Sequence, residues 1–515
     1  MSRTSCTVYD DETAKKVHVP VLFYYTIHFA TNVLKLSKWR PARPSSFISA
    51  SVRQKRNRIG KGFFMSLITL VVSDLHLADG NAILDGWGEY QQAALEGLVL
   101  ATHPGGPLGQ ADSIELIING DCFDFLVTPP CEPHGISDIP MALGKLEKII
   151  AAHGPFFATL RQFLAVQGRR VTFITGNHDI ELRFKPVRER ILEAIGGSQG
   201  AEAITFCPMR FYRPLPDVYI EHGNYYDFWN HAAAGLWDEA GQPLNDDPQQ
   251  ITLPVGSYYY QQAAHLISES YPYFDHFEPA MGTVRAMALL CVLNPELVVE
   301  VTRRICALMS HPYTPLAGLR PGEERDAAKL FSAAMMDFAA FQQEMQERKT
   351  DWTPVVGLDI AQAQTNALVE FSMLRQTLAQ PAAEAIAAIC TPATYQMAEE
   401  VATGMHNVLQ NDPTLRYAIA GHTHMVRIDP LNQGRQAYLN TASWTTRVAQ
   451  PAPGEITPSL IEWLRAPDWQ NIPLRDVTQL VFAMITAAPG GEVPAASASL
   501  CVWEGGAKGH YRVLA

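Results

Sequence analysis

The fold is decided by an apolar run that ends in two polar residues, Leu67-Ile68-Thr69-Leu70-Val71-Val72-Ser73-Asp74-Leu75-His76. A short, β-rich apolar run of this kind predicts a buried strand. Five further runs are expected to be strands for the same reason, at 114–119, 170–175, 218–221, 417–420 and 437–440. Helical stretches such as 90–98 and 141–166 separate several of them, and this alternation predicts an α/β fold.

Each of the first five strands is followed at once by a polar cluster. The clusters are Asp74-Leu75-His76, Gly120-Asp121-Cys122-Phe123-Asp124, Gly176-Asn177-His178-Asp179, His222-Gly223 and Gly421-His422-Thr423-His424. In open α/β sheets, ligands bind at the carboxyl ends of the strands. We therefore expect the clusters to meet at one end of a single sheet.

The residue types in these clusters suit a pair of metal ions. Hydrolysis of a phosphate ester needs an activated water and neutralised phosphoryl oxygens, and two metal ions about 3.5–4 Å apart supply both. Mixed His, Asp and Asn ligands favour Mn, Fe, Zn, Co or Ni over Ca. One such cluster alone is a weak signal. Five unrelated buried polar clusters would be costly without partners, so their combination favours one site.

The order D-x-H, GDxxD, GNHD, H and GHxH resembles the signature of calcineurin-like metallophosphoesterases, over 65–222 and about 415–443. The resemblance implies a four-layer αββα sandwich with an inserted helical domain. It also implies two divalent transition-metal ions, with Mn favoured. One ion would be held by Asp74, His76, Asp121 and His424. The other would be held by Asp121, Asn177, His222 and His422, with Asp121 bridging the two.

By the same resemblance, His178 is the histidine that touches the phosphate without binding a metal. It would protonate the leaving oxygen while a metal-bridging hydroxide attacks a phosphate ester or pyrophosphate. We expect Asp179 to orient and charge His178. Asp124 is expected either to orient metal ligands or to bond its own loop. A catalytically weak scaffold and a nuclease are the alternative functions.

Two details bear on the branch of the family. Asp124 stands where purple acid phosphatases carry a ligand tyrosine, which disfavours that branch. Residues 73–77 and 221–223 resemble UDP-2,3-diacylglucosamine hydrolases. Those enzymes commonly carry Arg at the position of His178 and have a far shorter insertion. We therefore expect a phosphate-ester substrate that is either a small molecule or linked to a lipid.

Composition and periodicity divide the chain into three parts. Residues 65–223 and 414–515 are expected to form the phosphoesterase domain, and 224–413 a helical insertion or cap. The insertion lies between His222 and His422, so we expect it to select substrate at the mouth of the site; packing or oligomerisation is the other interpretation. Residues expected at the mouth are Tyr225, Tyr226, Asp227, Trp229 and His231.

The first 64 residues carry twelve Lys or Arg but only three acids. We interpret 1–64 as an N-terminal extension that is disordered or precedes the true start at Met65, with a transit peptide as the alternative.

Charge and cysteine content limit the partners and the compartment. The net charge of −12 over 515 residues argues against a nucleic-acid partner, which requires clustered Lys and Arg. The eight cysteines include no CxxC pair, which indicates free thiols in a reducing compartment. Residues 19–34 are too short and polar for a membrane span. We expect a cytoplasmic protein, with peripheral membrane contact left open.

Overall fold

The expected strands form, but they divide between two sheets. One sheet has seven strands in the order β16-β15-β14-β1-β2-β4-β5, and the other has five in the order β11-β12-β10-β7-β6. The expectation of a single sheet is therefore wrong. The physical reason is that β7 and β10 pair with each other in parallel and pack face to face on the first sheet instead of extending it.

The computed structural model describes residues 66–81, 85–132, 135–196, 201–227, 230, 236–278, 293, 294, 297, 300, 301, 304, 396–450, 457–466, 473–487 and 496–514. The described residues belong to one compact unit, Gly62–Arg320 with Phe371–Ala515. The predicted extension 1–64 lies outside them, as does most of the predicted insertion between 279 and 395.

The strands of the larger sheet are β1 (Leu67–Val72), β2 (Ser113–Asn119), β4 (Arg169–Ile174), β5 (Ile204–Phe206), β14 (Leu480–Ala487), β15 (Ala496–Glu504) and β16 (His510–Val513). Those of the smaller sheet are β6 (Phe211–Tyr212), β7 (Val218–Glu221), β10 (Tyr417–Ala420), β11 (Val426–Leu431) and β12 (Gln436–Thr441). All six strands expected from the sequence are present, with ends shifted by at most one residue. The strands that precede the polar clusters run parallel within each sheet, which brings their carboxyl ends together.

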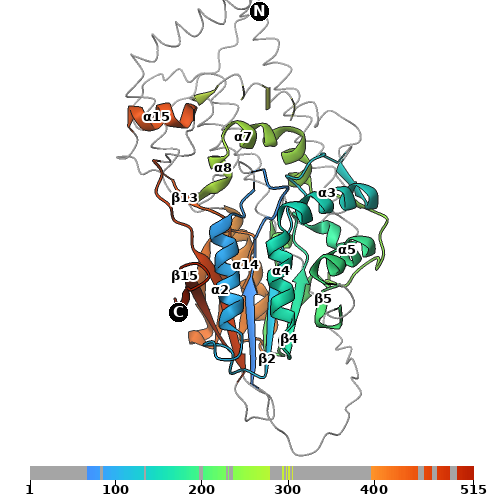
Figure 1. Ribbon diagram of the computed structural model, residues 1–515, viewed down its shortest axis with the longest axis vertical. Coiled ribbons are helices and arrows are strands. Elements are labelled where there is room, and N and C mark those ends of the chain that lie inside the picture. The colour runs from blue at the N-terminus through green and yellow to red at the C-terminus, as the bar shows by residue number, and fades with distance from the viewer. Residues whose placement is uncertain are drawn as a thin grey trace, which may run out of the picture. The chain divides into compact units, whose positions relative to one another are not determined.

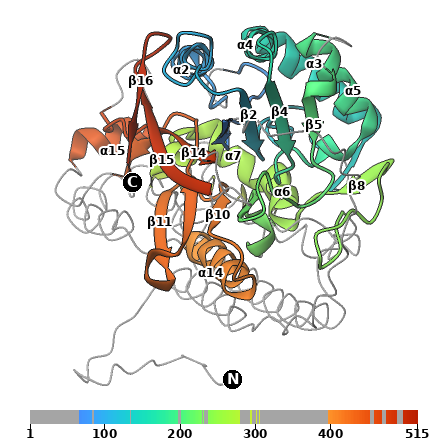
Figure 2. The same ribbon diagram turned by 90° about the horizontal axis from the view of Figure 1, so that it is seen from below.

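The two sheets pack against each other, and helices cover their outer faces (Figure 2). Along β2, Leu116 and Ile118 face the helices while Ile117 faces Ile220 and Ile419 of the smaller sheet. This alternation follows the period of two that places successive side chains on opposite faces. The covering helices are α2 (Glu89–Ala101), α3 (Ile139–Ala152), α4 (Gly154–Leu164) and α5 (Lys185–Ile195) on one side and α14 (Gln396–Asn411) on the other.

The helical stretch expected over 141–166 is broken in two at His153, between α3 and α4. Pro155 lies in the first turn of α4, where its missing N–H is tolerated, whereas a continuous helix would place it in the interior. The break lets α4 pack against both α2 and α5.

The described part of the predicted insertion contains strands as well as helices. We call residues 250–278 the cap segment. It comprises β8 (Gln250–Thr252), α6 (Val255–Tyr259), the π-helix η6 (Tyr260–Ala264), α7 (His265–Ser270), α8 (Tyr273–His276) and β9 (Phe277–Glu278). β8 pairs with β3 (Ile136–Asp138), and β9 pairs with β13 (Val448–Ala449). Figure 1 shows α7 and α8 beyond the carboxyl ends of the parallel strands.

Candidate metal centre

The loops after β1, β2 and β10 hold predicted ligands in an unusual backbone conformation. Among the described non-glycine residues, eight have positive φ, and five of these are predicted ligands: Asp74 (55°), His76 (50°), Asp121 (50°), His422 (66°) and His424 (57°). This conformation costs about 1–3 kcal/mol per residue, persists only when its surroundings hold it, and clusters at functional sites. The backbone is therefore strained where the ligands were predicted.

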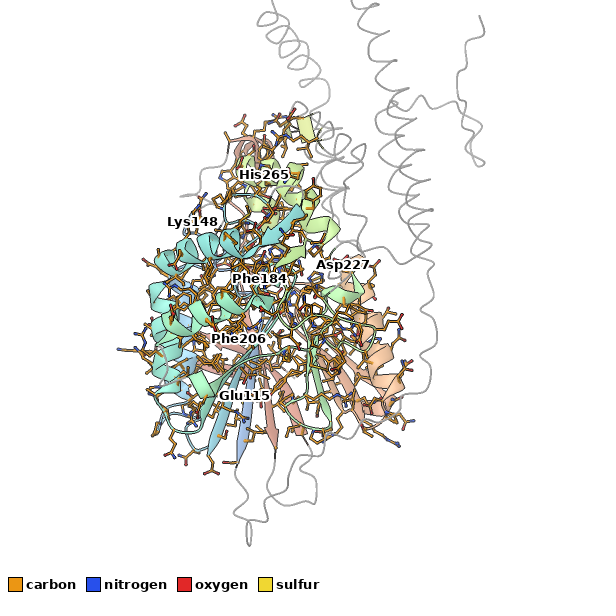
Figure 3. All side chains as sticks on the ribbon, turned by 90° about the vertical axis from the view of Figure 1, so that its right-hand side faces the viewer. Glu115, Lys148, Phe184, Phe206, Asp227 and His265 are labelled. Atoms are coloured by element: carbon orange, nitrogen blue, oxygen red, sulfur yellow. The ribbon has the colours of Figure 1, made fainter. Side chains whose placement is uncertain are left out.

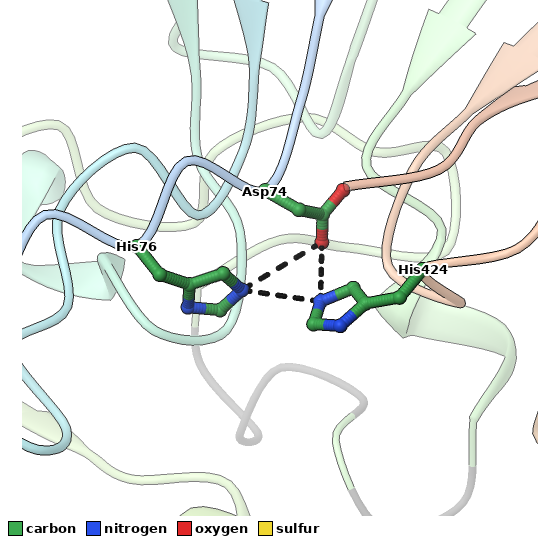
Figure 4. Close-up of side chains that lie close together, drawn as sticks. All are labelled: Asp74, His76 and His424. Atoms are coloured by element: carbon green, nitrogen blue, oxygen red, sulfur yellow. Dashed lines mark hydrogen bonds and ion pairs between the residues drawn. The ribbon is translucent and has the colours of Figure 1, made fainter. Parts of the chain in front are cut away.

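One group that could hold a metal ion consists of Asp74, His76 and His424 (Figure 4). Asp74 Oδ1 lies 3.2 Å from His424 Nε2 and 4.0 Å from His76 Nε2. The two Nε2 atoms are 3.1 Å apart. Figure 4 shows the three side chains converging from loops that are some 350 residues apart in sequence, at 74–76 and 424.

A second group consists of Asp121, His222 and His422, whose ligand atoms lie within 4.8 Å of one another. His222 Nε2 is 3.0 Å from Asp121 Oδ2. His76 Nε2, from the first group, is 3.9 Å from the same oxygen. Asp121 thus lies between the two groups, as expected for a carboxylate that bridges two ions.

At the second group, buried Asn177 Oδ1 has no hydrogen-bond partner among the described residues, and buried His222 Nε2 makes no hydrogen bond of good geometry although Asp121 Oδ2 lies 3.0 Å away. Asn177 is 4% exposed and His222 is 1% exposed. A buried polar atom left without a partner costs about 1–3 kcal/mol. A cation would satisfy both atom types, and a set of imidazole, carboxylate and amide oxygen fits a divalent transition metal.

Glycines precede three of the ligands because a side chain would collide with a neighbouring ligand. A Cβ on Gly176 would lie 2.1 Å from Asp121 Oδ1, and a Cβ on Gly120, where φ is +80°, would lie 2.3 Å from His222 Nδ1. Gly421 meets a third ligand in the same way. Side chains do not approach so closely, so glycine allows each ligand loop to pack on the next.

Bonds to the outer ring nitrogen determine which nitrogen of each histidine faces the site. His222 Nδ1 lies 2.9 Å from the carbonyl oxygen of Asn119. A carbonyl can only accept, so Nδ1 must be the donor. His76 Nδ1 lies 2.8 Å from Asp124 Oδ2. In both rings Nε2 is left to face the other ligands, which is how carboxylate and carbonyl partners support metal-binding histidines.

His178 is oriented by Asp124, so the predicted orienting role of Asp179 is wrong; the Asp179 charge contributes only after Asp124 and Asp121 to the raised pKa of His178. His178 Nδ1 lies 2.9 Å from Asp124 Oδ1. The Asp179 carboxylate instead accepts the backbone N–H groups of Gly176, at 2.7 Å, and Cys122, at 2.8 Å. Its side chain is directed at the backbone of two ligand loops, which it holds together.

Asp124 has both roles that the sequence left open. Its two carboxylate oxygens bond His76 and His178 separately, and Oδ1 also accepts the backbone N–H of Val127 at 3.0 Å. The two imidazole rings stand edge to face with centroids 4.6 Å apart. Asp124 therefore fixes a predicted ligand and the predicted proton donor through one side chain.

Burial and nearby carboxylates have opposite effects on these histidines. Burial lowers the pKa of His178, but the charges of Asp124 and Asp121 outweigh burial and raise the pKa to about 10. Burial also lowers the pKa of His222, and nearby carboxylates raise it to about 9. For His424, burial dominates and lowers the pKa to about 4. A bound dication would oppose protonation of the ligand rings.

Asp227 is a site residue that no motif marked. Its Oδ2 atom lies 3.1 Å from Nε2 of the predicted ligand His422. Figure 3 places Asp227 at the cluster-bearing end of the sheets, far from Glu115 near the start of β2. The sequence placed it only among residues expected at the mouth, because a single acid after His222 has no diagnostic spacing. Trp229 and His231, expected beside it, lie outside the described residues.

The loop after β12 also supports the site, and the sequence analysis gave it no role. Ser443 Oγ donates to the carbonyl oxygen of Asp74 at 3.0 Å, and the backbone N–H of Trp444 donates to the same oxygen at 3.1 Å. These two bonds satisfy the backbone of a residue in left-handed conformation. The loop therefore holds the first ligand in place.

No protein-family model matches the chain, and no curated protein sequence matches it. None of the helices in the described part of the chain has both the length and the apolar character needed to cross a membrane. The class of protein is thus defined by its fold and site. It is a mixed α/β protein with groups of His and Asp side chains that could hold metal ions.

Proposed function

We propose that this chain is a divalent-metal-dependent phosphoric ester hydrolase of the calcineurin-like metallophosphoesterase superfamily. The observation that carries the proposal is the pair of His/Asp groups that meet at Asp121. The two packed sheets with helices on both outer faces support the αββα sandwich expected for that superfamily.

The donor atoms favour two ions, with Mn preferred and Fe, Zn, Co or Ni as alternatives. The first ion would be held by Asp74, His76, Asp121 and His424, and the second by Asp121, Asn177, His222 and His422. When bound, the ions would lower the pKa of a water molecule and offset the negative charge of the phosphoryl oxygens. The protein residues around them must then orient the ester and deliver a proton to the leaving oxygen.

His178 is placed to deliver that proton. Its side chain is 22% exposed, whereas that of His222 is 1% exposed, so a substrate atom can reach the His178 ring. Asp124 holds Nδ1, which leaves the Nε2–H to donate. Burial lowers the pKa of His178, but the charges of Asp124 and Asp121 raise it to about 10, which favours the protonated ring. His178 is therefore the general acid, and Asp124 orients the ring and stabilises its charge.

The experiment is hydrolysis of phenyl phosphate, an alkyl phosphate, a phosphodiester and a nucleic acid by the purified chain, with Mn and with a chelator. We expect hydrolysis that the chelator abolishes and Mn restores. His178→Ala should lower turnover by about 100-fold or more with metal content unchanged, and more for the alkyl ester, whose leaving oxygen needs the proton more. The control is Glu202→Gln, an exposed residue.

Metal analysis provides the opposing outcome. If the purified chain binds no transition ion and added Mn produces no hydrolysis of any ester, the proposal is wrong. If only the nucleic acid is cleaved, the nuclease alternative replaces it.

A further inference from the structure

The cap segment is fastened to the same loop that supports the first ligand. Arg447, 3% exposed, donates from Nη1 to the carbonyl oxygen of Asp275 at 2.7 Å and from Nη2 to that of Phe277 at 2.8 Å. Directly after Arg447, β13 pairs with β9 of the cap segment. Since Ser443 of this loop holds Asp74, α8 and the first metal group share one support.

A second anchor joins the cap segment to the loop after β2, which carries Asp121 and Asp124. Gln261 of η6 donates from Nε2 to the carbonyl oxygen of Leu126 at 3.0 Å and accepts the backbone N–H of Glu132 at 3.2 Å. These groups are buried, so the bonds are shielded from water. The cap segment is thus tied to two of the loops that carry or support ligands.

Between these anchors, the cap segment presents hydrogen-bond acceptors. Tyr260 Oη donates to Asp275 Oδ2 at 3.5 Å, and Ser268 also bonds this carboxylate. His276 Nδ1 lies 3.0 Å from the carbonyl oxygen of Thr446, so Nδ1 is the donor. Burial and the charge of Arg447 lower the pKa of His276 to about 4, so the ring is neutral and its Nε2 is an acceptor.

These acceptors lie near the reacting end of the site. Burial raises the pKa of Asp275, and the charges of Asp124 and of His178, the proposed proton donor, also act on it. His276 interacts in the same way with the ligand His76. The backbone N–H of Thr446, whose carbonyl group bonds His276, donates to the carbonyl oxygen of Gly86 at 3.4 Å. Gly86 in turn lies beside His76, because a Cβ on Gly86 would be 3.9 Å from Cβ of His76.

The positive charge of Arg447 is already engaged. The Arg447 guanidinium is bonded to two cap carbonyls and lies 3.6 Å from the Glu278 carboxylate. It is therefore not presented to an anionic group on a substrate. What the cap segment offers instead is a carboxylate and a neutral imidazole, both suited to accept hydrogen bonds.

We infer that Asp275 and His276, with Tyr260, form a subsite that selects phosphate esters whose leaving group donates hydrogen bonds, through hydroxyl or ammonium groups. This inference rests on the proposed phosphoesterase function. The subsite disfavours leaving groups that are anionic or purely hydrocarbon, because the first would meet the Asp275 charge and the second would leave the acceptors unpaired.

The test compares Asp275→Asn with wild type on glycerol phosphate, phosphoethanolamine and phenyl phosphate. For the two esters with donors, kcat/KM should fall about 10- to 100-fold, as for loss of a hydrogen bond to a charged group. The loss for phenyl phosphate should be smaller, so the ratio of kcat/KM for the donor esters to that for phenyl phosphate should fall about 10-fold. A larger loss for phosphoethanolamine identifies an ammonium group as the preferred donor, and a larger loss for glycerol phosphate identifies hydroxyls. Glu269→Gln, an exposed acid of α7, is the matched control.

A second readout does not depend on turnover. Dissociation constants for a hydroxyalkyl phosphonate and for phenylphosphonate, measured by calorimetry with Mn bound, should show the same selective loss in Asp275→Asn. Equal weakening for all compounds, or no change for any, overturns the subsite. A wild-type protein that hydrolyses none of the esters refutes the proposed function instead, and the phosphonate titration then decides the subsite alone.

Discussion

The ligand loops and the cap segment lie at the same end of the sheets, but they are held in different ways. In the loops, five ligand residues have left-handed backbone and ligand carboxylates accept backbone N–H groups of neighbouring loops, as Asp74 does from His422. In the cap segment, no described residue has positive φ, and the segment is attached by pairing of β8 with β3 and β9 with β13 and by side-chain bonds of Arg447 and Gln261.

The ligand loops and the cap segment should therefore differ in how well they tolerate substitutions. A ligand loop cannot alter one residue without disturbing the next loop, because the loops bond and pack through the ligands themselves. The cap segment can change its exposed side chains while its two anchors stay in place. The contrast predicts that changes in the loops act on the proposed metal site, whereas changes in exposed cap side chains act on the proposed substrate choice, and variants can test this.

The largest effect is expected for Asp121→Asn in the ligand loops. Asparagine removes the charge that both groups share, so metal content should fall and kcat/KM should drop by about 1,000-fold or more. Metal analysis and kinetics on phenyl phosphate measure the two losses. Glu202→Gln is the control, and an Asp121→Asn protein that keeps both its metal and its activity would contradict the bridging role.

A smaller effect is expected for Asp124→Asn. An amide oxygen cannot accept from both His76 and His178 with full strength, so turnover should fall about 10- to 100-fold. The alkaline limb of the pH–rate profile should move to lower pH, because the Asp124 charge raises the pKa of His178. Asp179→Asn is the comparison, since its side chain bonds backbone instead. If Asp179→Asn moved that limb and Asp124→Asn did not, the pairing would be wrong.

In the cap segment, Arg447→Lys should act on substrate choice. A lysine ammonium cannot span the carbonyl groups of Asp275 and Phe277 as the guanidinium does. We expect kcat/KM for glycerol phosphate to fall about 10-fold with metal content unchanged, as for the loss of about 1.4 kcal/mol. Arg435→Lys, at an exposed position, is the control. Loss of metal in Arg447→Lys would contradict this expectation and show that the loop of Ser443 and Arg447 passes the change on to Asp74.

The smallest effect concerns stability of the metal-free protein. The folded pKa of His178, about 10, lies above the ordinary value of 6.5. The charged His178 ring therefore contributes fully to the free energy of unfolding below pH 6.5, and this contribution is lost as the pH rises through about 10. In chelator, the stability difference between wild type and His178→Gln should shrink by about 1 kcal/mol or more over that range. Urea unfolding at both ends measures it, and a constant difference would contradict the raised pKa.

The grouping of the Asp and His side chains was predictable because its signals are local. Asp74 follows one short apolar run, and Gly120 and Asp121 follow another. In each case the apolar run predicts the strand, and the polar residues after it predict the loop where the strand ends. The division into two sheets was not predictable in this way, since nothing local tells β7 to pair with β10 across about 200 residues.

The contacts of single side chains were predicted less well. Asp179 is adjacent to His178 in sequence, yet its side chain turns to backbone, and Asp124 reaches the ring across a different loop. The side chains of Arg447 and Gln261 bind backbone carbonyl groups. Every residue has such a group, so the sequence does not indicate which carbonyl group is bound.

The predicted ligands come from both sheets, which has a consequence for the life of the protein in a cell. Asp74, His76 and Asp121 follow strands of the larger sheet, while His222 and His422 follow strands of the smaller one. An ion shared by the two sets would cross-link the sheets, and ligands that bind only the folded state stabilise it by mass action. Resistance to proteolysis, and with it abundance, would then follow the supply of free metal.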